Sequence, residues 1–292
     1  MNTRSDAAGL GLEADDPATA AEVEAELSTT VAQPVEVLQP PRRRWGIYLA
    51  RVVVLVVALI LWEIAGNRDW IDQGLFGRPS GIWDAMWDYL PSDRGISSMK
   101  ATGQAVLYAF VIGSILGTLG GLILGIIPTL DDVIGPFLTP LNSVPRLALA
   151  PLFLVWFGLT TSAKVALAVT IVFFILAENA RSAVKSVDVD LMTMARVTGL
   201  KRPALVAKVV LPSAVPTMFA GLRLTFTYSL LGVVASEMIA APEGLGQDLV
   251  FFSSSYQINH MFAILVLFMF VATIVNFVFA ALERYLLRWQ RT

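Results

Sequence analysis

The stretch MFAILVLFMFVATIVNFVFAAL, residues 261–282, holds 22 residues without a single charge. A helix that crosses a bilayer needs about 20 mostly apolar residues, because each unpaired backbone group in hydrocarbon costs several kcal/mol. Five further segments meet or approach this length: residues 46–64, 104–127, 133–157, 163–180 and 214–240. The third of the six is the weakest, because Pro140, Pro145 and Pro151 interrupt it. We expect an all-α, polytopic membrane protein with about six transmembrane helices.

The composition agrees with a membrane protein. Of the 292 residues, 56% are hydrophobic and 15% are charged, against about 25% charged residues in an ordinary soluble domain. The mean hydropathy is +0.68. This balance excludes a soluble globular enzyme. The sequence has no cysteine and only one histidine, His260, so disulfides, thiol nucleophiles, cysteine-ligated metals and all-histidine metal sites are excluded as well.

Charge is distributed unevenly along the chain. Residues 1–41 carry eight acidic residues, one base (Arg4) and no aromatic residue, a composition that cannot bury enough apolar surface to fold. We predict a disordered acidic tail over residues 1–44 and a membrane domain over residues 45–292, with its core at about 97–285. With the N-terminus inside, the inside segments hold 12 Lys and Arg and the outside segments hold five. Both termini are therefore predicted to be cytoplasmic.

Two local patterns predict packing. In the loop 67–103, Ser80 can cap a short helix on the outer membrane surface. One face of that helix would carry Ile82, Trp83, Met86, Trp87 and Leu90. In the second span, four glycines follow one another at four-residue steps and would allow a neighbouring helix to approach closely: Gly113, Gly117, Gly121 and Gly125. Tight packing within one subunit and a moving interface both fit this spacing.

The cytoplasmic loop 181–212 is too polar to span and is regularly patterned. Asp188 or Asp190 can cap a helix over residues 191–198, which Gly199 would end. A second short helix over residues 204–211 would follow and stop at Pro212. The first helix and its turn would expose apolar side chains that need a covering surface: Leu191, Met194, Val197 and Leu200. A loop that only retains the topology would explain the bases but not this pair of helices.

The residues of this loop resemble a known motif. Ala195-Arg-Val-Thr-Gly199, followed after nine residues by Val209-Val-Leu211-Pro212, is similar to the EAA loop, E-A-A-x3-G-x9-I-x-L-P, of permease subunits of bacterial ABC importers. Thr193, Met194 and Val209 depart from that pattern. The resemblance covers about residues 46–285 and extends to the branch that imports nitrate, taurine and alkyl sulfonates. The residues that resemble this branch are the segment 144–158, Arg78-Pro-Ser80, Gly221-Leu-Arg223, Ala235-Ser-Glu-Met-Ile239 and Gly244-Leu-Gly246.

The resemblance implies a transport subunit of the bacterial inner membrane that is not itself an enzyme. In that family the loop forms a coupling helix that docks on a separate ATPase. The residues implied in coupling are Leu191, Met194, Ala195, Arg196, Val197, Gly199, Leu200, Lys201, Leu211 and Pro212. The sequence contains no G-x-x-x-x-G-K-[ST] phosphate loop, so ATP and Mg²⁺ would belong to the partner. The implied partners are a second copy of this chain, two ATPase subunits, an extracytoplasmic solute-binding protein and the lipid bilayer, without nucleic acid.

Charged residues at membrane depth are costly and mark positions of interest: Arg146, Glu178, Arg223 and Glu237. Arg223 lies eleven residues after Pro212, roughly 16 Å along a helix and near mid-bilayer. Glu178 is its candidate partner, and Glu237 is expected near the outer interface. These arginines would either line a path for small anions or form pairs that fix the helices.

We therefore expect the translocation subunit of an importer for a small anionic solute of the sulfonate, taurine or nitrate kind. The alternative is a secondary transporter driven by an ion gradient. Such proteins commonly carry internal repeats with ionisable residues at matching midplane positions, and the sequence shows no such repeat.

Overall fold

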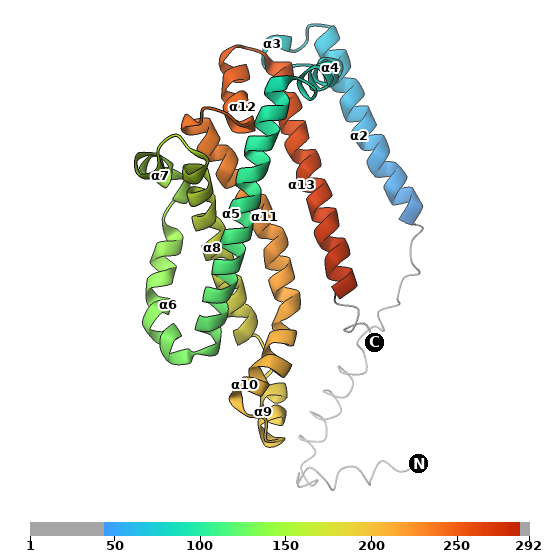
Figure 1. Cartoon of the computed structure of the whole chain (residues 1–292). Helices are drawn as coiled ribbons and strands as arrows, with labels where there is room; N and C mark the ends of the chain where they lie inside the picture. Colours follow the sequence, from blue (N-terminus) through green and yellow to red (C-terminus); the bar gives the residue numbers. More distant parts are fainter. Residues whose placement is uncertain (1–43, 287–292) are drawn as a thin grey trace, which may run out of the picture. The chain divides into compact units, whose positions relative to one another are not determined.

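The computed structural model describes residues 44–286, so the tail predicted for residues 1–44 lies outside the described residues apart from Arg44. The chain divides into two units, Met1–Val57 and Ala58–Thr292. Throughout residues 44–286 the secondary structure is helical and contains no strand, which confirms the all-α prediction (Figure 1). The elements are α2 (Arg44–Asn67), α3 (Gln73–Phe76), α4 (Pro79–Tyr89), α5 (Asp93–Ile126), α6 (Pro128–Ser143), the 3₁₀ turn η2 (Arg146–Leu149), α7 (Ala150–Phe157), α8 (Thr161–Lys185), α9 (Val189–Val197), α10 (Arg202–Leu205), the π-turn η3 (Val206–Val210), α11 (Leu211–Ala240), α12 (Leu245–Ser254) and α13 (Ile258–Leu286).

Among the described residues, five helices are long and apolar enough to cross a membrane, or up to six if one bent pair counts as a span. The bent pair is Pro128–Ser143 with Arg146–Phe157, which meet at 82°. It coincides with the predicted segment 133–157. The bend lies at Val144, which is extended (φ −65°, ψ 128°) because the following Pro145 disfavours the helical region. The prediction of about six spans is therefore confirmed, with the third one broken where prolines interrupt it.

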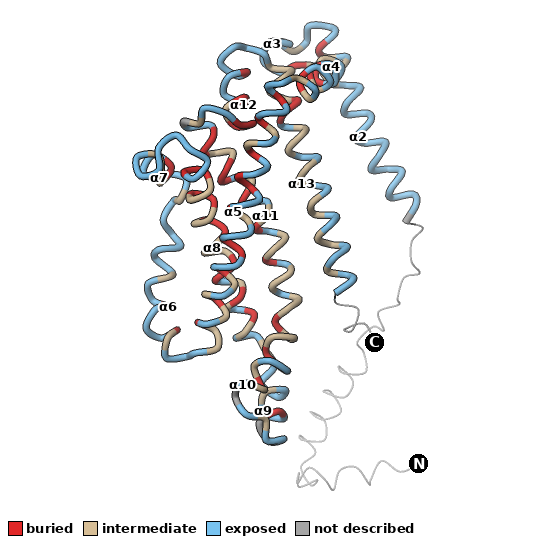
Figure 2. The backbone as a smooth tube through the Cα atoms, in the orientation of Figure 1, coloured by how far each residue is buried: buried red, intermediate tan, exposed pale blue. Residues whose placement is uncertain are grey.

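The unit Ala58–Thr292 has two ends, which we name the α9 end, where α9 and α10 lie, and the α12 end, where α4 and α12 lie (Figure 1). α5 and α8 both run from the α12 end to the α9 end, and α6 returns from the end of α5. Buried residues concentrate along α5, α8 and α11 (Figure 2). The most extensive contact is that of α5 with α8, followed by that of α8 with α11. These three helices form the core of the unit.

The four glycines of α5 all face α8. A Cβ added at Gly113 or Gly125 would meet the Cβ of Val172 or Val184 at 2.7 Å, and one at Gly117 would meet that of Leu176 at 3.0 Å. The contacts therefore advance by four residues on both helices, in parallel. This confirms that the glycine stripe serves close packing within one chain.

We expect Gly121→Ala to destabilise the protein by about 1–3 kcal/mol, the usual cost of overpacking. The added Cβ would meet the Cβ of Ala180 at 2.8 Å and would approach the backbone carbonyl of Ala177 still more closely. Gly120→Ala is the matched control, because its Cβ would meet only the ring of Phe173, at 3.6 Å. Thermal unfolding of the two variants in detergent measures the difference. Equal unfolding temperatures for the two variants would show that α8 moves enough to accommodate the added methyl group.

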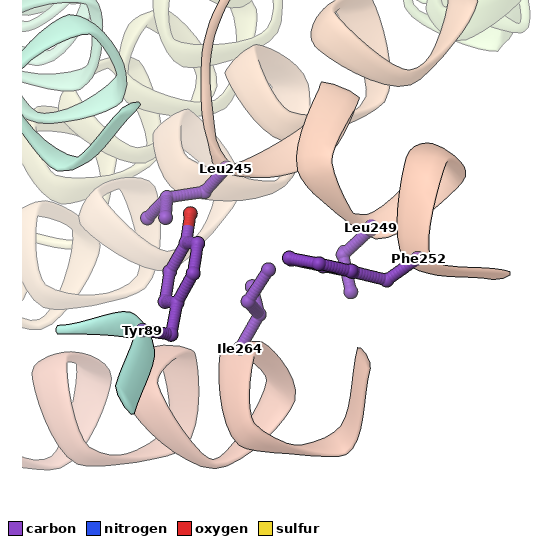
Figure 3. Packing of buried hydrophobic residues seen from close by; sticks show 5 residues of the cluster. All are labelled: Tyr89, Leu245, Leu249, Phe252 and Ile264. Carbon is purple, nitrogen blue, oxygen red and sulfur yellow. The ribbon is translucent and has the colours of Figure 1, made fainter. Parts of the chain in front are cut away.

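At the α12 end, side chains from three elements form one apolar cluster: Tyr89 of α4, Leu245, Leu249 and Phe252 of α12, and Ile264 of α13 (Figure 3). The Tyr89 hydroxyl donates to the Asp248 carboxylate at 2.5 Å, and burial raises the pKa of Tyr89 above its ordinary value. Asp248 also pairs with Arg94 at 2.7 Å. α12 is thereby held to α4, α5 and α13.

The helix predicted after Ser80 forms as α4, but its cap and its buried face differ from the prediction. Arg78 is the N-cap and Pro79 occupies the first turn, while the Ser80 backbone N–H and hydroxyl both donate to Glu63, at 3.0 and 2.8 Å. Ile82, Ala85 and Tyr89 are the buried residues of α4. Trp83 and Trp87 are exposed and stack edge to face. Because Trp83 is one residue from Ile82, or about 100° around the helix, the two cannot both face the protein.

Candidate functional site

The predicted pair of helices around Gly199 is present at the α9 end. Asp188 begins α9, because its carboxylate accepts the Asp190 backbone N–H at 2.8 Å and its carbonyl accepts that of Met192 at 3.1 Å. Gly199 has φ +78°, a left-handed conformation that other residues rarely adopt. The Asp188 cap and the Gly199 turn are therefore confirmed. α8 continues to Lys185, so residues 181–185 of the predicted loop are helical instead.

One side of this helix pair is anchored and the other is exposed. Ala195, Leu205 and Val210 form a buried cluster, against which Met192 and Leu200 pack. The prediction that Leu200 is exposed is therefore wrong, since the Gly199 turn directs the chain back onto the cluster. Leu191, Met194 and Val197 are exposed by 48%, 67% and 83%.

These three exposed side chains follow at three-residue steps and so lie within one third of the helix circumference. We name them the α9 face. Lys201, beside it in the turn, is exposed. The side chains of Arg196 and Arg202 lie outside the described part of the structure.

The second helix does not stop at Pro212. α10, η3 and α11 form one helical run, Pro203–Ile239. Pro212 stands in the first turn of α11, directly after the π-turn, which shifts the hydrogen-bond pattern where the proline N–H is missing. Leu211 and Pro212 are half-buried within the run. The element that carries the α9 face is therefore continuous with a membrane-spanning helix.

A cavity of about 580 Å³ lies beside this element. Its lining is mostly apolar and comes from the α5–α6 turn, α8, α9 and the start of the helical run, including Gly125, Pro128, Met192, Leu200 and Val206. The base of α9 is thus only partly packed.

The prediction that Arg223 pairs with Glu178 is wrong. Arg223 forms its ion pair with Glu283 of α13. Gly221 packs against Asn179 of α8, and Arg223 lies two residues, or about 200°, further around α11. Its side chain therefore points away from α8 and towards α13. Glu178 forms an ion pair with Arg181 instead, at 3.3 Å and one turn along the same helix.

Glu237 lies near the α12 end of α11 and is 1% exposed. Its carboxylate accepts hydrogen bonds from Lys164 Nζ (3.0 Å), the Thr102 hydroxyl (2.9 Å) and the Gly246 backbone N–H (2.9 Å). Lys164 also donates to the Glu243 carbonyl at 2.6 Å. This buried network joins α5, α8, α11 and α12.

The charge count places Lys164 among the five outside bases, at the edge of the predicted span 163–180, and the sequence does not indicate this network. Lys164 stands in the first turn of α8, directly before a long apolar run, and that position was the available signal. A second missed cluster joins Asp131 of α6 to Arg181 and to Lys185, the latter at 2.5 Å. It fixes the start of α6 to the end of α8.

Arg146 lies in η2, at the bend between α6 and α7. Its guanidinium stands 4.6 Å from the centre of the Phe174 ring and donates to the carbonyl and the side chain of Asn142. Its Nε is buried without a hydrogen-bond partner. Of the arginines placed at membrane depth, Arg223 has a carboxylate partner, whereas Arg146 pairs with none among residues 44–286.

Within the described part of the chain, no group of three or more His, Cys, Asp or Glu is arranged to hold a metal ion. The arrangement offers instead an exposed apolar face joined to a membrane helix, and charged residues held inside the bundle.

Comparison with known proteins agrees with this architecture. A family model described as "Binding-protein-dependent transport system inner membrane component" matches residues 93–291. The chain is 27% identical over 272 residues to SsuC of Bacillus subtilis (strain 168), which is named as an aliphatic sulfonates transport permease protein. That alignment covers 93% of this chain and 98% of SsuC.

A second relative is TauC of Escherichia coli (strain K12), a taurine transport system permease protein, which is 32% identical over 169 residues, or 58% of each chain. Among solved structures, a bacterial ABC transporter involved in the import of the acidic polysaccharide alginate superposes with a TM-score of 0.58 at 14% identity. That superposition covers 84% of this chain and 96% of the other. At this identity, the likeness concerns the fold alone.

Proposed function

Because the chain belongs to the binding-protein-dependent transport system inner membrane component family, we propose that it forms the translocation pathway of an importer and couples it to ATP hydrolysis by a separate subunit. The chain is an ABC importer permease of the sulfonate and taurine branch and an inner-membrane protein. This membership favours ATP-driven import over the ion-gradient alternative.

The observation that carries the coupling proposal is the α9 face. Leu191, Met194 and Val197 are large apolar side chains left exposed on a helix that is otherwise anchored. Interface centres are apolar and poor in charge, whereas their rims are polar. The α9 face with Lys201 beside it has this composition. We place the α9 end, with both termini, in the cytoplasm and assign the face to a groove of an ATPase subunit that binds ATP and Mg²⁺.

The complete importer would contain two copies of this chain, two ATPase subunits and an extracytoplasmic solute-binding protein, as the family implies. ATP can shift the permease between inward-open and outward-open states only if the ATPase contacts the α9 face differently in the two. The continuous run Pro203–Ile239 would carry that difference into the membrane.

The solute class follows from the relatives. SsuC and TauC are named for transport of aliphatic sulfonates and of taurine, both of which bear a sulfonate group. A small sulfonate-like anion is therefore the proposed solute.

A single cysteine tests the coupling proposal, because the chain contains no other. Val197→Cys, labelled with a maleimide benzophenone in the assembled complex, should crosslink to the ATPase subunit on illumination. Trp87→Cys is the control, because Trp87 is 58% exposed but lies at the α12 end. Crosslinking from Trp87 alone, or from neither position in any nucleotide state, would refute the proposed docking. Solute uptake by this chain alone under an ion gradient would support the secondary transporter.

A further inference from the structure

A line of polar residues runs along α6 towards its bend. Thr139, Asn142 and Ser143 are exposed and lie within about 100° of the helix circumference. Arg146 joins them, because its guanidinium folds back to donate to Asn142. We name these four residues the α6 polar stripe. Leu141, on the other side of the same helix, is 52% exposed and apolar.

Arg146 lies beside the middle of α8, a helix long and apolar enough to cross a membrane. Phe174, on which Arg146 stacks, lies 13 residues from the start of α8 and 11 from its end, or about 20 Å and about 16 Å along the helix. Charged and polar side chains at this depth face a protein interior or a water-filled cavity, because facing lipid costs several kcal/mol. Within one chain the stripe is exposed, so water or a second chain must cover it.

Arg146 also lacks a compensating charge. An aromatic ring and an amide offset a half-buried cation only in part, and no carboxylate among residues 44–286 pairs with Arg146. Arg223, by contrast, is neutralised by Glu283. The site around Arg146 is therefore short of one negative charge.

We propose that the α6 polar stripe lines the water-filled passage and that Arg146 binds the negatively charged group of the solute as it passes. This inference rests on the proposed function and deepens it, since it names the residue that selects for anions. A guanidinium offers forked donors to sulfonate, carboxylate or phosphate oxygens. The Arg146 guanidinium has no carboxylate partner and can therefore accept the solute anion. A single cation binds weakly enough to release the solute again, as passage requires.

Cysteine labelling tests the proposal without knowledge of the solute. Ser143→Cys in the reconstituted importer is treated with two membrane-impermeant reagents, the anionic sulfonatoethyl methanethiosulfonate and the cationic trimethylammonioethyl methanethiosulfonate, with and without ATP. We expect both to react, and we expect Arg146→Met to lower the ratio of the anionic to the cationic rate about tenfold. Arg146→Lys should restore most of the ratio, which separates loss of charge from misfolding.

Two controls make the result specific. Leu141→Cys, on the opposite side of α6, should react with neither reagent. The double variant Arg223→Met/Glu283→Gln removes a neutral pair and should leave the ratio unchanged. A Ser143→Cys variant that is inert in every nucleotide state, or a ratio unaffected by Arg146→Met, would overturn the inference. Labelling reports access of water to Ser143→Cys and not contact between subunits, so its failure is distinguishable from failure of the Val197 crosslink.

Discussion

Replacing Met194 with aspartate is expected to reduce the amount of ATPase subunit that co-purifies with this chain about thirtyfold. Met194 is the middle residue of the α9 face and is 67% exposed in the single chain. A carboxylate there would be buried without a partner in an apolar groove, and disruption at an interface centre commonly costs about 2 kcal/mol or more. At about 1.4 kcal/mol for each tenfold change, this corresponds to a loss of about thirtyfold in affinity.

Thr193→Asp is the matched control for this experiment. Thr193 is the neighbouring residue, is exposed and uses its hydroxyl only to donate to the Val189 carbonyl, at 2.9 Å. The EAA pattern has an acid at this position, so a carboxylate should be accepted with less than a threefold change. Both variants should remain in the membrane, because neither disturbs the buried cluster of Ala195, Leu205 and Val210. Normal co-purification of the Met194 variant would remove the α9 face from the ATPase interface.

The second large effect concerns the buried pair of Lys164 and Glu237. We expect Lys164→Met to lower the free energy of unfolding by about 3–5 kcal/mol, the usual cost of leaving one buried charge without its partner. Glu237 is 1% exposed, so water cannot replace the ammonium group. Thr102 and the Gly246 N–H would remain bonded to the carboxylate but would not neutralise it.

A double-mutant cycle isolates this interaction. Lys164→Met/Glu237→Gln removes both charges and should recover more than half of the lost stability, because the amide keeps the size of the carboxylate. Lys100→Met provides the control for loss of a lysine, since Lys100 is exposed on α5 and forms no ion pair within residues 44–286. Glu237→Gln is the second single variant of the cycle, and unfolding in detergent titrated with sodium dodecyl sulfate measures the four proteins of the cycle and the control. If Lys164→Met is as stable as Lys100→Met, the Lys164–Glu237 pair contributes nothing to the free energy of unfolding.

The helices could be predicted from sequence because hydropathy is a local property. Residues 261–282 require a helix whatever surrounds them, and Pro145 bends the third span through its own backbone. The α9 helix and its Gly199 turn followed from a cap and a glycine in the same way. Helix ends were harder to predict. α5 starts at Asp93 and α8 ends at Lys185 because both continue beyond the apolar run, where hydropathy gives no signal.

The charge pairs could not be predicted, because they depend on the rotation and depth of helices distant in sequence. Arg223 is two residues from the contact with Asn179 and so faces α13 instead of Glu178. Lys164 and Glu237 are 73 residues apart and meet only because α8 and α11 pack side by side at the α12 end. No spacing rule connects such pairs.

The helical run Pro203–Ile239 is continuous, so a rotation at its α9 end is transmitted along its whole length. Of its 37 residues, those from Pro203, after the Gly199 turn, to Glu237 extend about 51 Å. A tilt of about 5° relative to α8, about the α9 end, would move the far end by about 4–5 Å and lengthen the 3.0 Å contact with Lys164. A displacement of the α9 end relative to α8 is thus expected to strain the Lys164–Glu237 pair at the opposite end of the run.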